Sequence, residues 1–370
     1  MTKWEIRNTG LKGKALCQFE TGNLLIYRAG HFDLIAPDDR KVINSFNLPF
    51  STLKKKLCKV RLLERVLHAE PRWACCASEN EALVYYGSNL WLVNVETGSY
   101  KAENLKAHGK PLQISRIHVE GFLDSYALGD YWKNQDREEV HIYQRCLNSN
   151  MWNTVYTFPK GAVRHIHGII ADEKSKAVYI LTGDEDNESG IWICRNNFQD
   201  VKPLLIGSQQ YRACQMMIAG TKMYYSTDAP SETNHLYMYD GCSVKKINKV
   251  AGSVIYGVRE GDSLLFATTV EPDAHAKNKI EYWLTNKRGI GIIDDSVHIY
   301  SFSEKDGLEE IFAAPHDRLP LRLFQYGAAT FCRGENDGKI YVSFVSVRGL
   351  DYQIYEIKDG TIQRNGDTTI

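Results

Sequence analysis

The chain has 370 residues, and its 45 Lys and Arg residues balance its 45 Asp and Glu residues, so the formal net charge is zero. A neutral chain has no overall field that attracts nucleic acid or an anionic membrane, and we expect neither as a partner. Residues 1–20 lack a secretory apolar run, and the nine cysteines form no CxxC pair. These features predict an unexported cytoplasmic protein with reduced thiols and no zinc ribbon.

Strands separated by tight turns are predicted along most of the chain, because the apolar runs are short, rich in Tyr, Trp and β-branched residues, and bounded by Gly, Asn and Asp. The exception is residues 51–67, "STLKKKLCKVRLLERVL", whose spacing of basic and apolar residues predicts a short helix or an ordered excursion. We interpret this segment as a solvated connector, and the alternative is a surface for a partner or a polyanion.

A recurrent unit of 43–54 residues runs through the chain, with an apolar strand, a turn, a second strand with a polar end, a loop and an aromatic third strand. The second strands end in "YALGDYW", "YILTGDED", "YYSTDAP" and "FATTVEP", which aligns Asp130, Asp184, Asp228 and Glu271 at spacings of 54, 44 and 43 residues. Third strands are predicted at "EEVHIYQR", "SGIWICR", "NHLYMYD" and "IEYWLTN".

A period of this length with four strands per unit is typical of a β-propeller, in which each blade buries its faces against its neighbours. We therefore predict an all-β fold, with residues 1–370 as a single propeller domain of seven blades, six blades being the alternative. The predicted blades span residues 15–50, 64–106, 111–161, 162–210, 211–252, 253–320 and 324–366. Residues 3–8, "KWEIRN", are expected to add an outer strand to the last blade and close the ring.

The innermost strand of a propeller blade starts at the rim of the central channel where the second strand ends. The predicted strand starts supply Arg72, Arg116, Arg164, His165, His167, Arg212, Tyr256 and Tyr326. We expect these side chains to share one channel mouth with the four aligned acids. Arginine forks suit a carboxylate or a phosphate, and paired carboxyl groups with separated pKa values suit acid–base chemistry. The combination indicates a site for an anionic sugar.

The binding role falls to arginines, with polar residues around them: Arg72, Arg116, Arg212, Asp130, Asp228 and Tyr326. The alternative is that each aligned Asp closes a turn through its own backbone, and that the tyrosine packs in the inner strand.

The candidate catalytic residues are Asp184 and Glu271 as acid–base groups, Tyr256 as a nucleophile, and His165 and His167 as groups that polarise the substrate or transfer protons. The histidines could instead pack in the channel wall or hold a metal. We expect no cofactor and no tightly bound zinc or iron, because a cysteine ligand pattern is missing and the nearby arginines would compete with a cation.

Several stretches between residues 111 and 275 resemble a largely uncharacterised group of sialidase-like (BNR-repeat-like) propeller proteins: "PLQIS", "REEVHIYQR", "TGDEDNESGIWI", "GSQQYRA" and "YYSTDAPSETNHLY". The resemblance implies the propeller fold. True sialidases are more distant relatives, which bind a sugar carboxylate with three arginines and carry S-x-D-x-G-x-x-W boxes. The segment "DEDNESGIW" only approximates such a box.

The leading hypothesis is a carbohydrate-active enzyme that acts on an acidic glycan, by sialidase-like hydrolysis or by elimination. A second hypothesis is a non-catalytic propeller that binds a glycan or a protein. A third is a lyase that uses a divalent metal held by His165 and His167 with acids. An enzyme requires a closed pocket with carboxyl groups, whereas a binding platform would be flat and aromatic.

Overall fold

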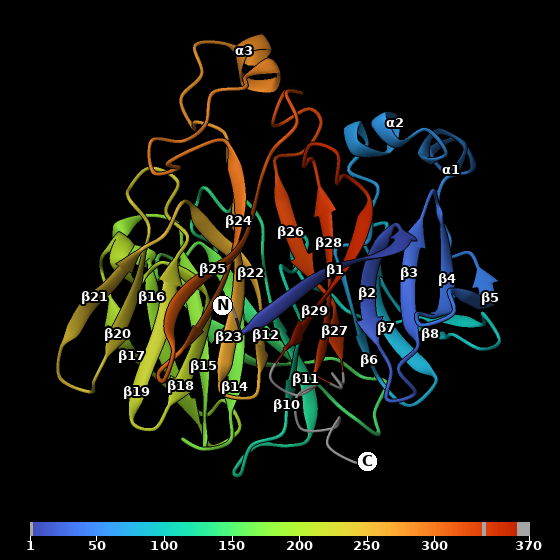
Figure 1. Cartoon of the computed structure of the whole chain (residues 1–370). Coiled ribbons are helices and arrows are strands. Elements are labelled where there is room, and N and C mark those ends of the chain that lie inside the picture. Colours follow the sequence, from blue (N-terminus) through green and yellow to red (C-terminus); the bar gives the residue numbers. More distant parts are fainter. Residues whose placement is uncertain (1–2, 335–337, 361–370) are drawn as a thin grey trace, which may run out of the picture.

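The repeats of the sequence fold into four-stranded antiparallel sheets that stand around a common axis, as the computed structural model shows for residues 3–334 and 338–360 (Figure 1). Seven sheets form the ring, six with four strands and one with a fifth short strand, so the prediction of an all-β, seven-bladed propeller is confirmed. The predicted end of the last blade, residues 361–366, lies outside the described residues.

Three blades come from the first part of the chain. The first contains β2 (Lys14–Gln18), β3 (Leu24–Arg28), β4 (His31–Ala36) and β5 (Lys41–Phe46). The second contains β6 (Trp73–Cys76), β7 (Glu81–Tyr86), β8 (Asn89–Asn94) and β9 (Tyr100–Ala102). The third contains β10 (Ser115–Ile117), β11 (Ser125–Gly129), β12 (Val140–Cys146) and β13 (Asn153–Phe158).

The next three blades follow in the same order. The fourth contains β14 (His165–Asp172), β15 (Ala177–Gly183), β16 (Gly190–Arg195) and β17 (Asp200–Ile206). The fifth contains β18 (Ala213–Ala219), β19 (Lys222–Thr227), β20 (His235–Tyr239) and β21 (Val244–Lys249). The sixth contains β22 (Ser253–Glu260), β23 (Ser263–Thr269), β24 (Ser296–Ser303) and β25 (Gly307–Pro315).

The two ends of the chain close the ring within the seventh blade. Its inner strands are β26 (Ala328–Phe331), β28 (Lys339–Val345) and β29 (Gln353–Asp359), and β1 (Trp4–Lys12) pairs with β29 as the outer strand. The predicted closing strand is therefore confirmed. In addition, β27 (Arg333–Gly334) pairs in parallel with β2 and so links the last blade to the first.

Apolar side chains fill the spaces between neighbouring blades. Between the first and second blades, the ring of Phe32 lies 5.3 Å from those of both Tyr27 and Tyr86, in edge-to-face arrangements. Such aromatic contacts add to the apolar area that each blade buries against the next. The blade interfaces therefore carry the core and leave the loops at both ends of the ring free to vary.

Short helices interrupt the strand pattern at two places on one end of the ring (Figure 1). They are α1 (Thr52–Cys58) and α2 (Arg61–Val66) before the second blade, and α3 (Lys279–Leu284) in the loop after β23. One-turn helices, η1 (Asp186–Glu188) and η2 (Gln209–Tyr211), lie in other loops. No helix of the described ranges has the length and apolar character that crossing a membrane requires.

The strand predicted at "IEYWLTN" is wrong, because these residues form α3 and the third strand of this blade is β24. The side chain of Asn278 accepts a hydrogen bond from the backbone N–H of Glu281 and so caps the helix. The aromatic content of this segment is typical of a strand, but the local cap favours a helical turn.

The interpretation of residues 51–67 as a solvated connector is also wrong for α2. Arg65 is 2% exposed, and its guanidinium donates to Asp317 Oδ2, Ser346 Oγ and the carbonyl oxygen of Phe324, each at 2.6 Å. These partners lie before and within the seventh blade. Arg65 therefore ties α2 to the far end of the chain.

We expect Arg65→Met to lower the free energy of unfolding by about 3 kcal/mol, because it leaves Asp317 without a buried cationic partner. Urea titration measures the change, and Lys56→Met on the exposed face of α1 is the matched control. A loss no larger than that of the control would contradict the assigned role of Arg65.

Candidate functional site

Asp184, in the loop after β15, lies among basic side chains from two blades. Its Oδ1 lies 3.0 Å from Arg212 Nη2, 3.3 Å from His167 Nε2 and 3.4 Å from His165 Nε2, and its Oδ2 lies 3.2 Å from Arg164 Nη1. The structure thus brings together the histidines at the start of β14 and the acid at the end of β15. We call His165, His167, Asp184, Arg212 and Asp228 the Asp184 cluster.

Local backbone geometry positions the two histidines. A β-bulge between Ile166 and Gly168 places His167 as an extra residue in β14, opposite no single partner of β15. Bulges redirect side chains and are common beside functional sites. Gly183 is required here, since a Cβ at this position would lie 2.5 Å from His167 Cε1.

Both imidazole rings are oriented by backbone carbonyl groups. His165 Nδ1 lies 2.7 Å from the carbonyl oxygen of Trp132, and His167 Nδ1 lies 3.3 Å from that of Ala213. A carbonyl oxygen only accepts, so each Nδ1 donates and each Nε2 presents its lone pair. The Nε2 atoms lie 3.1 Å apart, and both lie beside the Asp184 carboxylate.

The charge state of Asp184 follows from this environment. Burial raises the pKa of its carboxyl group, but the contacts with His165 and His167 and the charge of Arg212 outweigh burial and hold the pKa well below its usual value. Asp184 therefore stays ionised. We assign it a charge-balancing role in place of the acid–base role expected from the sequence.

Asp228 occupies the inner side of the cluster. Its Oδ2 lies 3.6 Å from Arg212 Nη2 and accepts a hydrogen bond from Cys214 Sγ at 3.5 Å. Its Oδ1 is buried and has no hydrogen-bond partner within the described residues. Arg212 is shared between Asp184 and Asp228, so its guanidinium is engaged inside the protein and is not free to clamp a substrate.

A cavity of about 770 Å³ opens at the end of the ring that carries the helices, since residues in or next to these helices line it. Four of the predicted site residues line it, namely Arg72, Tyr256, Glu271 and Tyr326. Further residues complete the wall, including Lys14 at the start of β2, Glu70 before the second blade, Tyr282 and Trp283 of α3, and Arg322 before β26. The sequence pattern did not indicate Glu70, Tyr282, Trp283 and Arg322, because they lie outside the repeating strands.

Glu271 connects the cavity with the Asp184 cluster. Burial, followed by the charge of Asp228, raises the pKa of Glu271 to about 7, against the opposing effect of Arg212. Its Oε2 is buried without a hydrogen-bond partner in the described part of the chain. A carboxyl group that titrates near neutrality suits proton transfer, so the acid–base role predicted for Glu271 fits its environment.

Aromatic side chains lie near Arg72, a basic residue of the cavity wall. The Arg72 guanidinium lies 5.2 Å from the ring of Tyr131, which in turn lies 4.3 Å from the ring of His165. Burial raises the pKa values of Tyr256 and Tyr326, so both phenols stay protonated. A protonated phenol is a weak nucleophile, which argues against the nucleophilic role predicted for Tyr256. Tyr131 was missed, although it directly follows Asp130 at an aligned strand end.

Arg116 does not join the site, which corrects the prediction. In the pairing of β10 with β11 it lies opposite Tyr126, near the start of β11, whereas the channel mouth is at the strand's end. Gln113 takes the position expected for Arg116, since its Nε2 donates to the carbonyl oxygen of His167 at 3.1 Å. Arg116 lies inside β10, which begins at Ser115, whereas Gln113 precedes the strand.

Asp130 acts as a turn-closing residue, the alternative that the sequence left open. Its two carboxylate oxygens accept hydrogen bonds from the backbone N–H groups of His108 at 2.5 Å and His141 at 2.9 Å. These bonds occupy the carboxylate in organising its own loops, so the substrate-binding role predicted for Asp130 has no geometric support.

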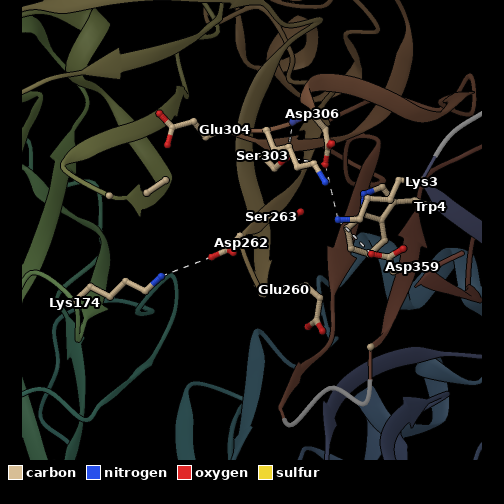
Figure 2. Close-up of a pocket in the computed structure, with 15 residues that line it drawn as sticks. Lys3, Trp4, Lys174, Glu260, Asp262, Ser263, Ser303, Glu304, Asp306 and Asp359 are labelled. Atoms are coloured by element: carbon tan, nitrogen blue, oxygen red, sulfur yellow. Dashed lines mark hydrogen bonds and ion pairs between the residues drawn. The ribbon is translucent and has the colours of Figure 1, made fainter. Parts of the chain in front are cut away.

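A second hollow, of about 720 Å³, lies at the opposite end of the ring, where β22 and β23 are joined (Figure 2). Lys3 pairs with Asp306 at 3.9 Å and Asp359 at 3.2 Å, and Lys174 pairs with Asp262 at 3.7 Å. Two of its lining cations, Lys3 and Lys174, are thus balanced by neighbouring acids. We place the candidate site at the other end, where buried charges converge.

No protein-family model and no curated protein matches this sequence, so the predicted sialidase-like family is not confirmed. Solved structures of similar fold include an oligogalacturonate lyase in complex with manganese, with 11% identity, a TM-score of 0.56, and coverage of 97% of this chain and 92% of that one. A chain of the mitotic checkpoint complex has 9% identity, a TM-score of 0.52, and coverage of 96% and 94%. These likenesses define the chain as a β-propeller and no more.

Proposed function

We propose that this protein is a carbohydrate-active enzyme that cleaves an acidic saccharide in the cavity beside the Asp184 cluster. The observation that carries the proposal is the presence of Arg72 and Glu271 in one cavity wall. Arg72 supplies a cation for a sugar carboxylate, and Glu271 supplies a carboxyl group for proton transfer.

The charge and shape of the cavity support an acidic ligand. Five basic side chains line it, Lys14, Lys54, Lys110, Arg72 and Arg322, against two acids, Glu70 and Glu271. Glu70 is already paired with Arg61. The volume lies within the range of about 300–1,000 Å³ that is typical of small-molecule sites. A hollow of this kind favours an enzyme over a flat binding platform.

Elimination is favoured over sialidase-like hydrolysis. The three arginines predicted to clamp a carboxylate do not act together, because Arg116 lies elsewhere and Arg212 is bound by Asp184 and Asp228. A solved protein of similar fold is an oligogalacturonate lyase, and oligogalacturonate is an acidic oligosaccharide. We therefore propose a uronate-containing saccharide as the substrate class.

In the proposed reaction, ionised Glu271 takes the proton from the ring carbon next to the sugar carboxylate. The electron pair of that C–H bond forms a C=C bond with the neighbouring carbon, whose bond to the glycosidic oxygen breaks. The departing oxygen takes a proton from the Tyr256 phenol, which burial keeps protonated. The products are an unsaturated uronate and a shorter saccharide.

A panel of acidic oligosaccharides tests the proposal, with uronate oligomers, sialosides and neutral glycans as its three arms. Elimination produces a conjugated double bond that absorbs ultraviolet light, whereas hydrolysis produces a reducing end without this absorbance. We expect the ultraviolet signal from uronates only. Hydrolysis would overturn the proposed reaction, and saccharide binding without any turnover would favour a non-catalytic platform.

We expect Arg72→Ala to weaken binding of a uronate oligomer by about 10–100-fold, because a charge-assisted hydrogen bond contributes about 1.5–3 kcal/mol. Isothermal titration calorimetry measures the affinity. Arg116→Ala is the matched control, since Arg116 lies away from the cavity. Equal effects of the two changes would place the anion elsewhere.

A further inference from the structure

We infer that His165 Nε2, His167 Nε2 and Asp184 Oδ1 form a binding site for one divalent transition-metal cation. These atoms form a triangle with edges of 3.1, 3.3 and 3.4 Å. Nitrogen and oxygen ligands lie about 2.0–2.2 Å from such a cation, which separates neighbouring ligands by about 3.0–3.5 Å. The triangle thus matches one face of a coordination shell.

The protonation pattern of the two rings matches metal ligation. Each Nδ1 donates to a backbone carbonyl oxygen, that of Trp132 for His165 and that of Ala213 for His167. Hydrogen bonds of this kind fix the orientation of metal-binding histidines and leave Nε2 as the ligand atom. The two Nε2 atoms and Asp184 Oδ1 therefore lie within 3.4 Å of one another, an arrangement that a cation stabilises.

Carboxylates outnumber guanidiniums around these three atoms, which favours binding of a cation. Four carboxylates lie in this region, Asp184, Glu185, Glu188 and Asp228, against three guanidiniums, Arg137, Arg164 and Arg212. The buried Asp228 Oδ1, unpaired within the described ranges, adds to the negative potential. The side chain of Asp184 is 25% exposed, so an ion can reach the open side of the triangle.

The ligand set selects the class of ion. Two imidazole nitrogens and one carboxylate suit manganese, iron, cobalt or zinc, whereas magnesium and calcium prefer oxygen ligands throughout. Other groups of His, Cys and Asp fit less well. The carboxylate of Asp130 accepts two backbone hydrogen bonds, and Cys214 keeps its hydrogen to donate to Asp228.

The test uses the metal alone and needs no substrate, so its failure is distinct from failure of the proposed function. Purified full-length protein is treated with a chelator, dialysed, and titrated with Mn²⁺ while electron paramagnetic resonance follows the free ion. We expect one Mn²⁺ per chain and an increase in melting temperature, a similar result with Zn²⁺, and much weaker binding of Mg²⁺. Failure of the wild-type protein to bind either Mn²⁺ or Zn²⁺ would overturn the inference.

Substitutions of the proposed ligands test where the ion binds. His165→Gln and Asp184→Asn should each weaken Mn²⁺ binding by more than about 100-fold. His108→Asn is the matched control, because His108 belongs to the group around Asp130. Retention of Mn²⁺ by folded His165→Gln, or loss of Mn²⁺ in His108→Asn, would place the ion elsewhere and contradict the assignment.

Discussion

Asp184→Asn is expected to lower the free energy of unfolding by about 3–5 kcal/mol, even with chelator present to remove any bound cation. The carboxylate lies within 3.2 Å of the guanidinium groups of both Arg164 and Arg212, whose side chains are 20% and 15% exposed. An amide would leave these largely buried cations without their counter-charge. The ion pairs of Asp184 therefore stabilise the fold.

Urea unfolding of the wild type and the variant at neutral pH measures this effect. Asp186→Asn provides the control, because Asp186 is exposed in the same loop and its neutralisation should change stability by less than about 0.5 kcal/mol. Similar stabilities for both variants would show that the Asp184 carboxylate contributes no net electrostatic stabilisation.

Glu271→Gln is expected to reduce turnover of a uronate oligomer by about 10²–10⁴-fold, because the amide cannot accept the proton. For the wild type, kcat/KM should rise as the pH increases through about 7, since only the ionised carboxylate acts as the base. Steady-state kinetics across this range tests both points. A rate that instead falls above pH 7 would identify Glu271 as a general acid and favour hydrolysis.

The same variant should gain stability relative to the wild type as the pH rises. The pKa of Glu271 is raised to about 7 in the folded protein, so its favourable contribution is complete below its unfolded-state pKa and is lost as the pH rises through 7. Glutamine has no charged form to bury. Between pH 5 and pH 8 the stability difference should shift in favour of glutamine by on the order of 2 kcal/mol.

Thermal or urea unfolding at the two pH values checks this shift, with Glu173→Gln on an exposed turn as the control. A pH-independent difference for Glu271→Gln would mean that the carboxyl group is not destabilised by burial, and it would remove the basis for its role in proton transfer.

Sequence periodicity by itself determined the propeller, because each blade repeats the same local pattern of short strands, polar strand ends and turns. The aligned endings at Asp184 and Asp228 reflect hairpins of similar length, which is why they and His167 reach one rim. The closure of the ring was also predicted from the sequence, since residues 3–8 have strand character and the last predicted blade lacked an outer strand. These features depend on nearby residues in the chain.

Only the tertiary structure decided which of the aligned side chains share a site. The short strand β10 places Arg116 opposite Tyr126, and it is Gln113, shifted by three residues along the chain, that reaches the carbonyl oxygen of His167. Such shifts arise from bulges and strand lengths that a hydrophobic pattern does not specify. The positions of strand starts therefore needed the folded backbone.

The chemical state of the site also depends on contacts between distant segments. Arg212 is engaged by Asp184 and Asp228 across two blades, and the carbonyl groups that set the histidine tautomers come from neighbouring blades. Charge, protonation and metal affinity follow from these non-local distances, because electrostatic interactions fall steeply with separation and with exposure to water. A linear sequence specifies which groups are present, and the folded ring determines which of them interact.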